Sequence, residues 1–203
     1  MMIPDNPDRF SSKTSPVEPS PDPASREAVS ETSEATVQGQ AEQEQDRYFM
    51  GLALEEAHSA GCLDEVPIGA VLVLNGQVLA RGHNQTRWRR DPCAHAELRA
   101  IQRATQATGD LRLPGAVVYT TVEPCFMCAG ALVHARVERV VWGVRDKKFG
   151  GCVSLGHVLD HPDANHQVKY TEGVRADEAA DLLRTFFKSK REAARKKRSQ
   201  DRS

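Results

Sequence analysis

The chain has 203 residues and a formal net charge of −1, which corresponds to one domain with room for a tail. It contains no apolar run of about eighteen residues and no basic and apolar leader at its N-terminus, so we expect neither a membrane span nor a secretory signal. An odd number of cysteines, five, argues against a disulfide framework and predicts a reducing compartment, the cytoplasm.

The charge is distributed unevenly along the chain. Residues 1–45 carry a net charge of −6 and are rich in Pro, Ser, Glu, Thr and Gln, which predicts a disordered acidic tail, because such a segment has too little apolar surface to fold. Residues 184–203 carry a net charge of +7, typical of a surface that binds a polyanion, or simply of a solvated helix end. We therefore expect a folded domain at 46–190 and a basic C-terminal tail at 191–203.

The hydrophobic pattern of residues 46–190 alternates between helix and strand. The run at 67–74 is almost wholly apolar, as in a strand buried on both faces, and Asn75-Gly76 predicts a tight hairpin after it. The expected elements, in order, are a helix at 46–61, strands at 67–74 and 77–80, a helix at 94–107, a strand at 117–121, a helix from Pro124 to His134, strands at 139–144 and 168–170, and a helix at 177–195. This order predicts an α/β fold with helices on both faces of a sheet.

One pair of motifs points to a catalytic metal centre. His95 and Glu97 lie about thirty residues before Cys125 and Cys128, which follow Pro124. Zn²⁺ prefers tetrahedral nitrogen and sulfur ligands and keeps one position for water when it is catalytic. Cysteines at i and i+3 at the start of a helix present both sulfurs on one face, where the helix dipole favours thiolates. Histidine-x-glutamate followed by Pro-Cys-x-x-Cys is the known pattern of zinc base deaminases, for which tRNA adenosine deaminase is an established example.

Other interpretations exist for the parts of this pattern. A lone Cys-x-x-Cys is shared by redox dithiols and structural zinc knuckles. A knuckle needs a fourth Cys or His at tight spacing, and none follows within the next turn. With His95 and Glu97 in register with the pair, we interpret the residues as ligands of one Zn²⁺ per subunit, His95, Cys125 and Cys128, with Glu97 as the general acid and base beside the water.

The chain resembles the bacterial tRNA adenosine deaminases of the cytidine and deoxycytidylate deaminase superfamily, from about Tyr48 to about Arg191. The resemblance rests on the segments Glu65-Val66-Pro67-Ile68-Gly69-Ala70-Val71, Ala94-His95-Ala96-Glu97, Glu123-Pro124-Cys125-Phe126-Met127-Cys128-Ala129-Gly130-Ala131, Arg145-Asp146, Asn165-His166 and Thr171-Glu172-Gly173. It implies a three-layer α/β/α, cytidine-deaminase-like fold with a mixed central sheet of about five strands, and a homodimer.

The resemblance also implies a reaction and a substrate. The expected reaction is hydrolytic deamination of adenosine to inosine at the wobble position of a tRNA anticodon stem-loop. Asn84 is expected to contact the target nucleotide, and Asp146, Lys148 and Phe187 its neighbours. Phe149 and Val153 depart from the small residues that the family has in this loop. The segment 1–45 lies outside the resemblance.

Two other functional classes share parts of this pattern. A deaminase of a free base or nucleoside, of the guanine or cytosine type, has the same zinc site but no need for the basic C-terminal segment. A non-catalytic, zinc-containing RNA-binding subunit has no use for Glu97.

For Cys62, Cys93 and Cys152 the expectation is that they are small buried hydrophobic residues.

Overall fold

The computed structural model describes residues 23–201, with side chains described over 37–201. The chain divides into two compact units, 1–40 and 41–203, and the second contains the whole sheet. The elements are α1 (Pro23–Cys62), β1 (Gly69–Leu74), β2 (Gln77–His83), α2 (Thr86–Arg89), α3 (Ala96–Thr108), β3 (Val117–Val122), α4 (Phe126–His134), β4 (Arg139–Val144), β5 (Lys169–Glu172) and α5 (Ala176–Gln200).

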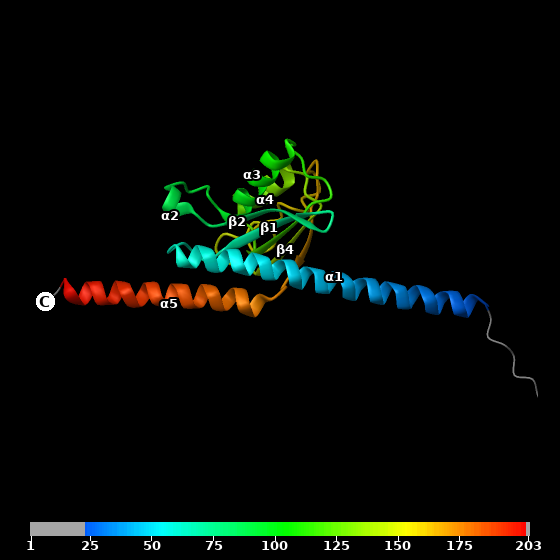
Figure 1. Ribbon diagram of the computed structural model, residues 1–203, viewed down its shortest axis with the longest axis horizontal. Coiled ribbons are helices and arrows are strands. Elements are labelled where there is room, and N and C mark those ends of the chain that lie inside the picture. The colour runs from blue at the N-terminus through cyan, green and yellow to red at the C-terminus, as the bar shows by residue number, and fades with distance from the viewer. Residues whose placement is uncertain (1–22, 202–203) are drawn as a thin grey trace, which may run out of the picture. The chain divides into compact units, whose positions relative to one another are not determined.

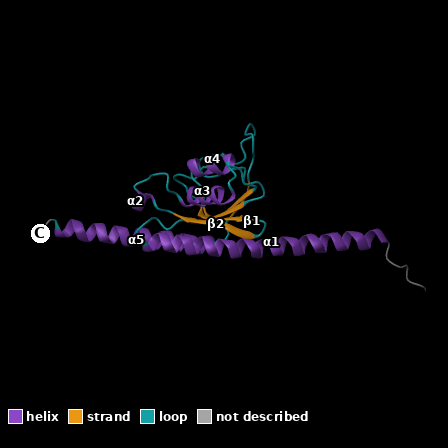
Figure 2. Cartoon of the chain, turned by 45° about the horizontal axis from the view of Figure 1, so that its top comes forward, coloured by secondary structure: helices purple, strands orange, loops and turns teal. Residues whose placement is uncertain are grey.

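A mixed five-stranded sheet forms the centre of the second unit, in the order β2-β1-β3-β4-β5. The pairs β1–β2 and β1–β3 are antiparallel, and the pairs β3–β4 and β4–β5 are parallel. The expected mixed sheet of about five strands is confirmed, and β2 and β5 are its edges. Figures 1 and 2 show the strands between two layers of helix.

Each face of the sheet is covered by its own helices, which confirms the three-layer arrangement. Helices α3 and α4 lie on one face, and α5 with the C-terminal part of α1 lies on the other (Figure 1). The first core is centred on Leu72, Val118, Leu132 and Trp142, all fully buried. The second core includes Met50, Val71 and Val141. Successive residues of β1 therefore enter opposite cores, as the uninterrupted apolar run predicts.

Glycines allow two helices to pack directly against the hairpin. A Cβ atom on Gly69 would lie 2.1 Å from the Ala53 carbonyl oxygen of α1, and one on Gly82 would lie 2.3 Å from the Ala96 carbonyl oxygen of α3. The hairpin turn has φ of 51° at Asn75 and 73° at Gly76, the left-handed conformation that an Asn-Gly turn requires. Gly82 thereby fixes the first turn of α3 against β2.

The ends of the chain differ from the sequence expectation. Helix α1 extends back to Pro23, across part of the segment 1–45 for which we predict disorder, while residues 1–22 lie outside the described residues. The extension is rich in Glu, Gln and Ala, which are strong helix formers even where nothing packs against them. Likewise, α5 continues without a break through position 191 to Gln200. Within the described part of the chain no helix is long and apolar enough to cross a membrane.

A buried ion pair ties α1 to the sheet. The Asp46 carboxylate accepts hydrogen bonds from Arg139 Nη2 at 2.6 Å and from the Tyr119 hydroxyl at 3.0 Å. Arg139 also pairs with Glu42, 3.0 Å away. The side chain of Asp46 is only 4% exposed, so its charge depends on Arg139 for compensation.

We expect Arg139→Met to lower the free energy of unfolding by about 3–5 kcal/mol, because it leaves the buried Asp46 charge unpaired. Urea titration of the variant measures the change. Arg112→Met, at an exposed arginine, is the matched control and should change stability by less than about 0.5 kcal/mol. Equal effects of the two substitutions would contradict a stabilising role of the buried pair.

Candidate active site

The two predicted ligand segments meet at the starts of α3 and α4. His95 is the N-cap of α3 and Cys125 is the N-cap of α4, both in extended conformation. The helices begin slightly later than the sequence suggests: α4 begins at Phe126 rather than at Pro124, so Cys128 is at its third position. The spacing still presents both sulfurs to the histidine, because the N-cap and the third helical residue lie on the same side of the first turn.

Three ligand atoms form a compact group. His95 Nδ1 lies 3.6 Å from Cys125 Sγ and 3.6 Å from Cys128 Sγ. Tetrahedral zinc with Zn–S of about 2.3 Å and Zn–N of about 2.0–2.1 Å requires nitrogen–sulfur separations of roughly 3.5–3.6 Å. The donor set and its spacing therefore fit a zinc ion.

Glu97 lies beside this group and is not one of its three members. Its side chain is buried, with Oε2 3.5 Å from Cys128 Sγ. Burial raises the pKa of Glu97 above the usual range for a glutamate. A carboxyl group whose pKa is moved towards neutrality can both accept and return a proton near physiological pH.

The two cysteines differ in their electrostatics. A hydrogen bond from Cys128 and a second from His95 lower the pKa of Cys125 to about 4, in spite of partial burial. The same hydrogen bond with Cys125, together with burial, raises the pKa of the Cys128 thiol. The hydrogen bond to Cys125 also raises the pKa of His95. Before a cation binds, the group thus has one ready thiolate, Cys125, and a metal ion competes with protons for Cys128 and His95.

Glu123 organises the loop that follows β4. Its buried carboxylate accepts backbone N–H bonds from Asp146 at 3.0 Å, Cys152 at 3.2 Å, Val153 at 2.8 Å and Ser154 at 2.9 Å, and a hydroxyl bond from Ser154 at 2.5 Å. Burial opposes ionisation, but these hydrogen bonds outweigh it and lower the pKa of Glu123. Glu123 is therefore a structural hydrogen-bond partner of this loop.

Glu123→Gln should lower the free energy of unfolding by about 2–4 kcal/mol at neutral pH, since an amide nitrogen then faces N–H donors and each donor left unpaired costs about 1–3 kcal/mol. A lowered folded pKa means that the wild-type carboxylate contributes fully above its unfolded pKa of about 4.3 and loses the contribution as the pH falls through the folded value. Urea unfolding should therefore show that the difference in free energy of unfolding between the wild type and Glu123→Gln is smaller at acidic pH than at neutral pH. A difference that grows in acid would contradict the stabilising role of the Glu123 carboxylate. The substitution Glu138→Gln, at an exposed glutamate, serves as the control.

Asn84 lies at the end of β2, next to the start of α3. Asn84 is buried, its backbone N–H donates to the Ile68 carbonyl oxygen at 3.0 Å, and no hydrogen bond joins its side-chain amide to another described residue. The next residue, Gln85, donates its backbone N–H to the Ala94 carbonyl oxygen at 2.9 Å, directly before His95. Asn84 is thus placed next to the ligand group with a free donor and acceptor.

The other predicted contact residues lie on two separate elements. Asp146 Oδ1 accepts N–H bonds from Lys148 at 2.9 Å and Phe149 at 3.2 Å, so this carboxylate shapes its own loop. The loop reaches the ligand group through a bridge between Gly150 and Cys125, and Lys148 is exposed on it. Phe187 lies on α5, on the opposite face of the sheet from α3 and α4, and its ring is 44% exposed.

Sequence reasoning missed the short helix α2 and its anchor. Glu65 is fully buried and accepts the Trp88 backbone N–H at 2.7 Å and the Thr86 hydroxyl at 3.2 Å. An acidic residue directly before an apolar strand is the only sequence signal for this contact.

The expectation of burial is correct for Cys152 and wrong for Cys62 and Cys93, which are exposed because they lie in a helix end and a surface turn.

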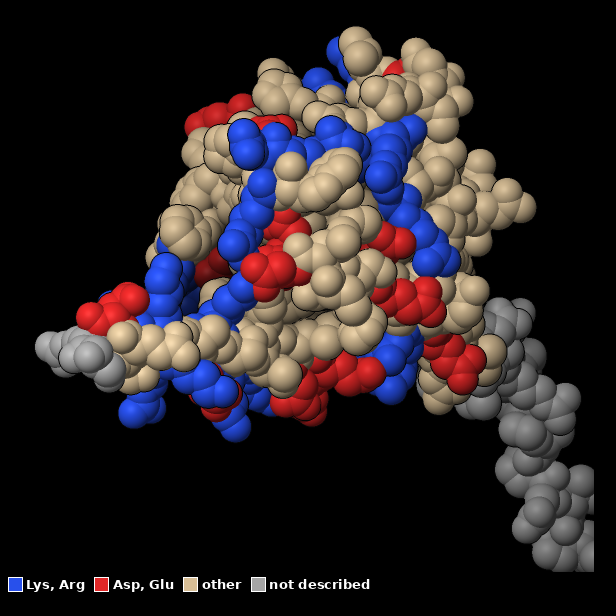
Figure 3. All heavy atoms as spheres, turned by 60° about the vertical axis from the view of Figure 1, so that its left-hand side comes forward, with Lys and Arg blue, Asp and Glu red and all other residues tan. Residues whose placement is uncertain are grey.

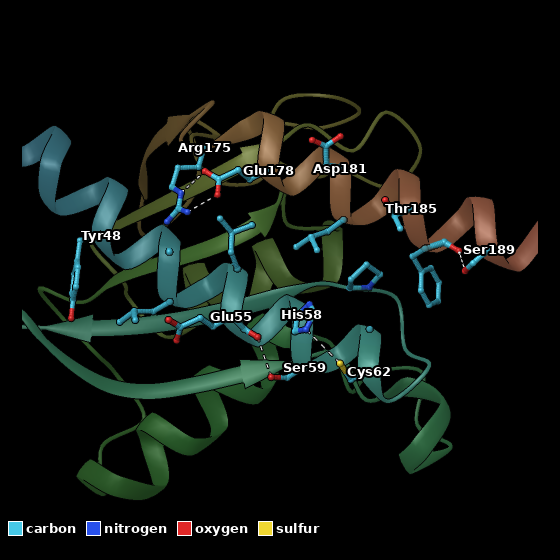
Figure 4. A pocket seen from close by; sticks show the side chains of 17 residues that line it. Tyr48, Glu55, His58, Ser59, Cys62, Arg175, Glu178, Asp181, Thr185 and Ser189 are labelled. Atoms are coloured by element: carbon cyan, nitrogen blue, oxygen red, sulfur yellow. Dashed lines mark hydrogen bonds and ion pairs between the residues drawn. The ribbon is translucent and has the colours of Figure 1, made fainter.

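A groove between α1 and α5 lies away from this group (Figure 4). Tyr48, Glu55 and His58 line it from α1, and Arg175, Asp181 and Phe186 are among the residues that line it from α5 and the turn before it. It contains none of the predicted metal ligands. The chemistry therefore lies at the starts of α3 and α4 and not in this groove.

The fold and the ligand group together define a deaminase. The model of the MafB19-like deaminase family matches residues 43–191, and the chain belongs to this family.

Its relatives point to one branch of the deaminases. The tRNA-specific adenosine deaminase of Agrobacterium fabrum is 49% identical over 144 residues, which is 71% of this chain and 95% of the relative. A solved structure from work on A-to-I editing by tRNA A34 deaminases is 48% identical, covers 67% of this chain and 99% of its own, and has a TM-score of 0.65. The guanine deaminase of Nitrosomonas europaea is 25% identical, covers 69% of this chain and 83% of its own, and has a TM-score of 0.61.

Proposed function

We propose that this protein is a tRNA adenosine deaminase that converts adenosine to inosine at the wobble position of an anticodon. The observation that carries this proposal is the match to tRNA-specific adenosine deaminases at nearly half identity along almost their whole length. The match to a guanine deaminase is only half as high in identity. We place the catalytic domain at 46–190, with the acidic segment 1–45 and the basic segment 191–203 flanking it.

In this proposal His95, Cys125 and Cys128 hold one zinc ion. The support is the fit of their separations to tetrahedral coordination and the position of Cys125 and His95 at helix starts. When bound, the zinc ion lowers the pKa of a water molecule and so supplies a nucleophile near neutral pH.

Glu97 moves the protons of the reaction. Its carboxylate accepts the proton of the water that attacks C6 of adenine and delivers that proton to N1. It then takes the second proton of the former water from the hydroxyl group on C6 and gives it to the amino group, so that the C6–N bond breaks, ammonia leaves and the C6 carbonyl of inosine remains. The raised pKa of Glu97 supports both roles, because burial makes the carboxylate a stronger proton acceptor than an exposed glutamate.

The surroundings of the ligand group suit a nucleotide presented from an RNA loop. Asn84 offers its unpaired amide to the target nucleotide, and Lys148 and Phe187 are exposed for its neighbours. Asp146 holds the loop that carries Lys148. The unpaired bases of an anticodon stem-loop are reached without opening a duplex. Because tRNA is made and used in the cytoplasm, we place the protein there.

A homodimer is part of the proposal. Apolar side chains are exposed around the start of α4: Phe126 is 49% exposed, Met127 38% and Leu155 56%. Phe126 packs against Gly151 and Gly156, where a Cβ atom would come within 2.7 Å of it, so these side chains form one surface. Contiguous exposed apolar surface beside a site is typical of a subunit interface.

The proposal is tested with the purified, zinc-loaded protein and four substrates in parallel: an anticodon hairpin with adenosine at the wobble position, free adenosine, cytidine and guanine. We expect inosine from the hairpin and no product from the other three. Turnover of a free base or nucleoside without turnover of the hairpin would keep the deaminase class and reject the tRNA substrate. A non-catalytic RNA-binding subunit would bind the hairpin and release no ammonia.

A further inference from the structure

Three arginines near the start of α3 have no acidic partner among the described residues. Arg89 Nε donates to Gln85 Oε1 at 2.8 Å, Arg99 Nη1 donates to Gln102 Oε1 at 2.8 Å, and Arg103 Nη1 donates to the Arg81 carbonyl oxygen at 2.7 Å. Neutral acceptors therefore orient all three guanidinium groups, and no described carboxylate forms a salt bridge with any of them.

Arg99 is at the centre of this group. Its Nε is buried and has no hydrogen-bond partner within the described part of the chain. Burial and the neighbouring charges of Arg89 and Arg103 lower the pKa of Arg99, and Asp91 opposes them only in part. The Asp91 carboxylate forms no salt bridge with Arg99; its Oδ1 accepts the Cys93 backbone N–H at 2.8 Å. An arginine held among like charges with an unpaired buried N–H is typical of a site that is complete only when an anion binds.

The group lies next to the proposed active site. The Arg99 backbone N–H donates to the His95 carbonyl oxygen at 2.9 Å, so the two residues are one helical turn apart, about 6 Å along the axis. Gln85, which orients Arg89, follows Asn84 directly. Figure 3 shows lysine and arginine side chains over much of one face of the molecule, with acidic side chains between them.

We propose that Arg89, Arg99 and Arg103 form a phosphodiester-binding subsite for the RNA strand beside the target nucleotide. The inference rests on the proposed function and names the part of the substrate that these residues recognise. Guanidinium groups suit this ligand, because their planar forks match the paired oxygens of a phosphate and stay charged at any physiological pH. A carboxylate from a second copy of the chain has related chemistry and is one outcome of the test.

The test compares Arg99→Gln and Arg103→Gln with Arg112→Gln, which removes the same charge from an exposed arginine beyond the far end of α3. Binding of an anticodon hairpin is measured over a range of salt concentrations, in zinc-loaded protein that carries Glu97→Gln to prevent turnover. Each subsite substitution should weaken binding at low salt and reduce the slope of log K against log salt by about one unit, the effect of one lost phosphate contact. Arg99→Lys should keep the slope, and Arg112→Gln should not change it.

The outcomes separate this inference from its alternatives. Unchanged slopes for both Arg99→Gln and Arg103→Gln would overturn it. Loss of the dimer in sedimentation with an unchanged slope would assign the group to a partner carboxylate and also overturn it. Arg99→Gln should unfold at no lower temperature than the wild type, because the Arg99 charge has no salt-bridge partner in the protein. A less stable Arg99→Gln variant would indicate a structural role for Arg99. In that case the salt slope of hairpin binding by Arg103→Gln decides whether the subsite binds a phosphate. Whether protein without these substitutions makes inosine from the same hairpin tests the proposed function separately.

Discussion

Replacement of Glu97 by glutamine is expected to abolish deamination while zinc stays bound. Glutamine has nearly the same shape but cannot accept the proton of the attacking water or return it to the base and the leaving group. A general acid or base contributes roughly 10²–10⁴-fold to a rate, and Glu97 serves two successive proton transfers, so we expect kcat to fall by at least about 10³-fold. Inosine formation under saturating hairpin measures the loss.

Three controls accompany this measurement. Zinc content should remain one per subunit, because Glu97 is not among the three residues that hold the ion in the proposal. The free energy of unfolding should be unchanged or higher, since burial disfavours the Glu97 carboxylate. Glu44→Gln, at an exposed glutamate of α1, should leave the rate unchanged. Turnover within about threefold of the wild type would reject Glu97 as the catalytic acid and base.

Replacement of Cys128 by serine should remove both the metal and the activity. The buried thiolate supplies one of three protein ligands, and serine is a poor zinc ligand at neutral pH. Because the ion binds only the folded chain, its loss also lowers stability, by about 4 kcal/mol if free zinc exceeds its dissociation constant 1,000-fold. Metal analysis, inosine formation and thermal unfolding measure the three effects, and a chelator acting on the wild type should reproduce them.

Two comparisons test the reason for this loss. Cys62→Ser changes an exposed cysteine and should keep metal, activity and melting temperature. Zinc affinity of the wild type should fall as the pH falls, because Cys128 and His95 have raised pKa values and compete for protons. A redox dithiol would instead lose a titratable disulfide in Cys128→Ser while the wild type contained no zinc. Full activity of the metal-free protein would reject the metal centre.

Local patterns predicted the parts of this fold that depend on short stretches of sequence. These parts are the Asn75-Gly76 turn, the doubly buried strand β1, and the placement of His95 and Glu97 at the start of α3. Each depends on a few neighbouring residues in the sequence. The resemblance to deaminases added the mixed central sheet of about five strands, which no local pattern contains, and the structure supplies the strand order.

Features that depend on contacts far apart in the sequence could not be predicted in this way. Helix α2 is held by Glu65, twenty-one residues before Thr86 in the chain. The loop after β4 takes its shape from Glu123, which reaches Ser154 thirty-one residues later. The group around Arg99 includes Arg89 from a different element, so no local pattern in the sequence brings these arginines together.

The limits of α1 and of α5 were predicted poorly for another reason. Composition indicated disorder for the acidic segment and a tail for the basic one, but both are rich in Ala, Glu, Gln, Lys or Arg, which favour helix without burial. The charge of a segment indicates which partners it can bind, but it does not predict whether its backbone is helical or disordered.

The most direct measurement is to map inosine in a full-length tRNA with adenosine at position 34, after incubation with the zinc-loaded protein. The account predicts complete conversion at position 34 and none at the other adenosines, because only the wobble nucleotide is presented to Asn84 and Glu97. Absence of inosine at position 34, with or without conversion elsewhere, would contradict it.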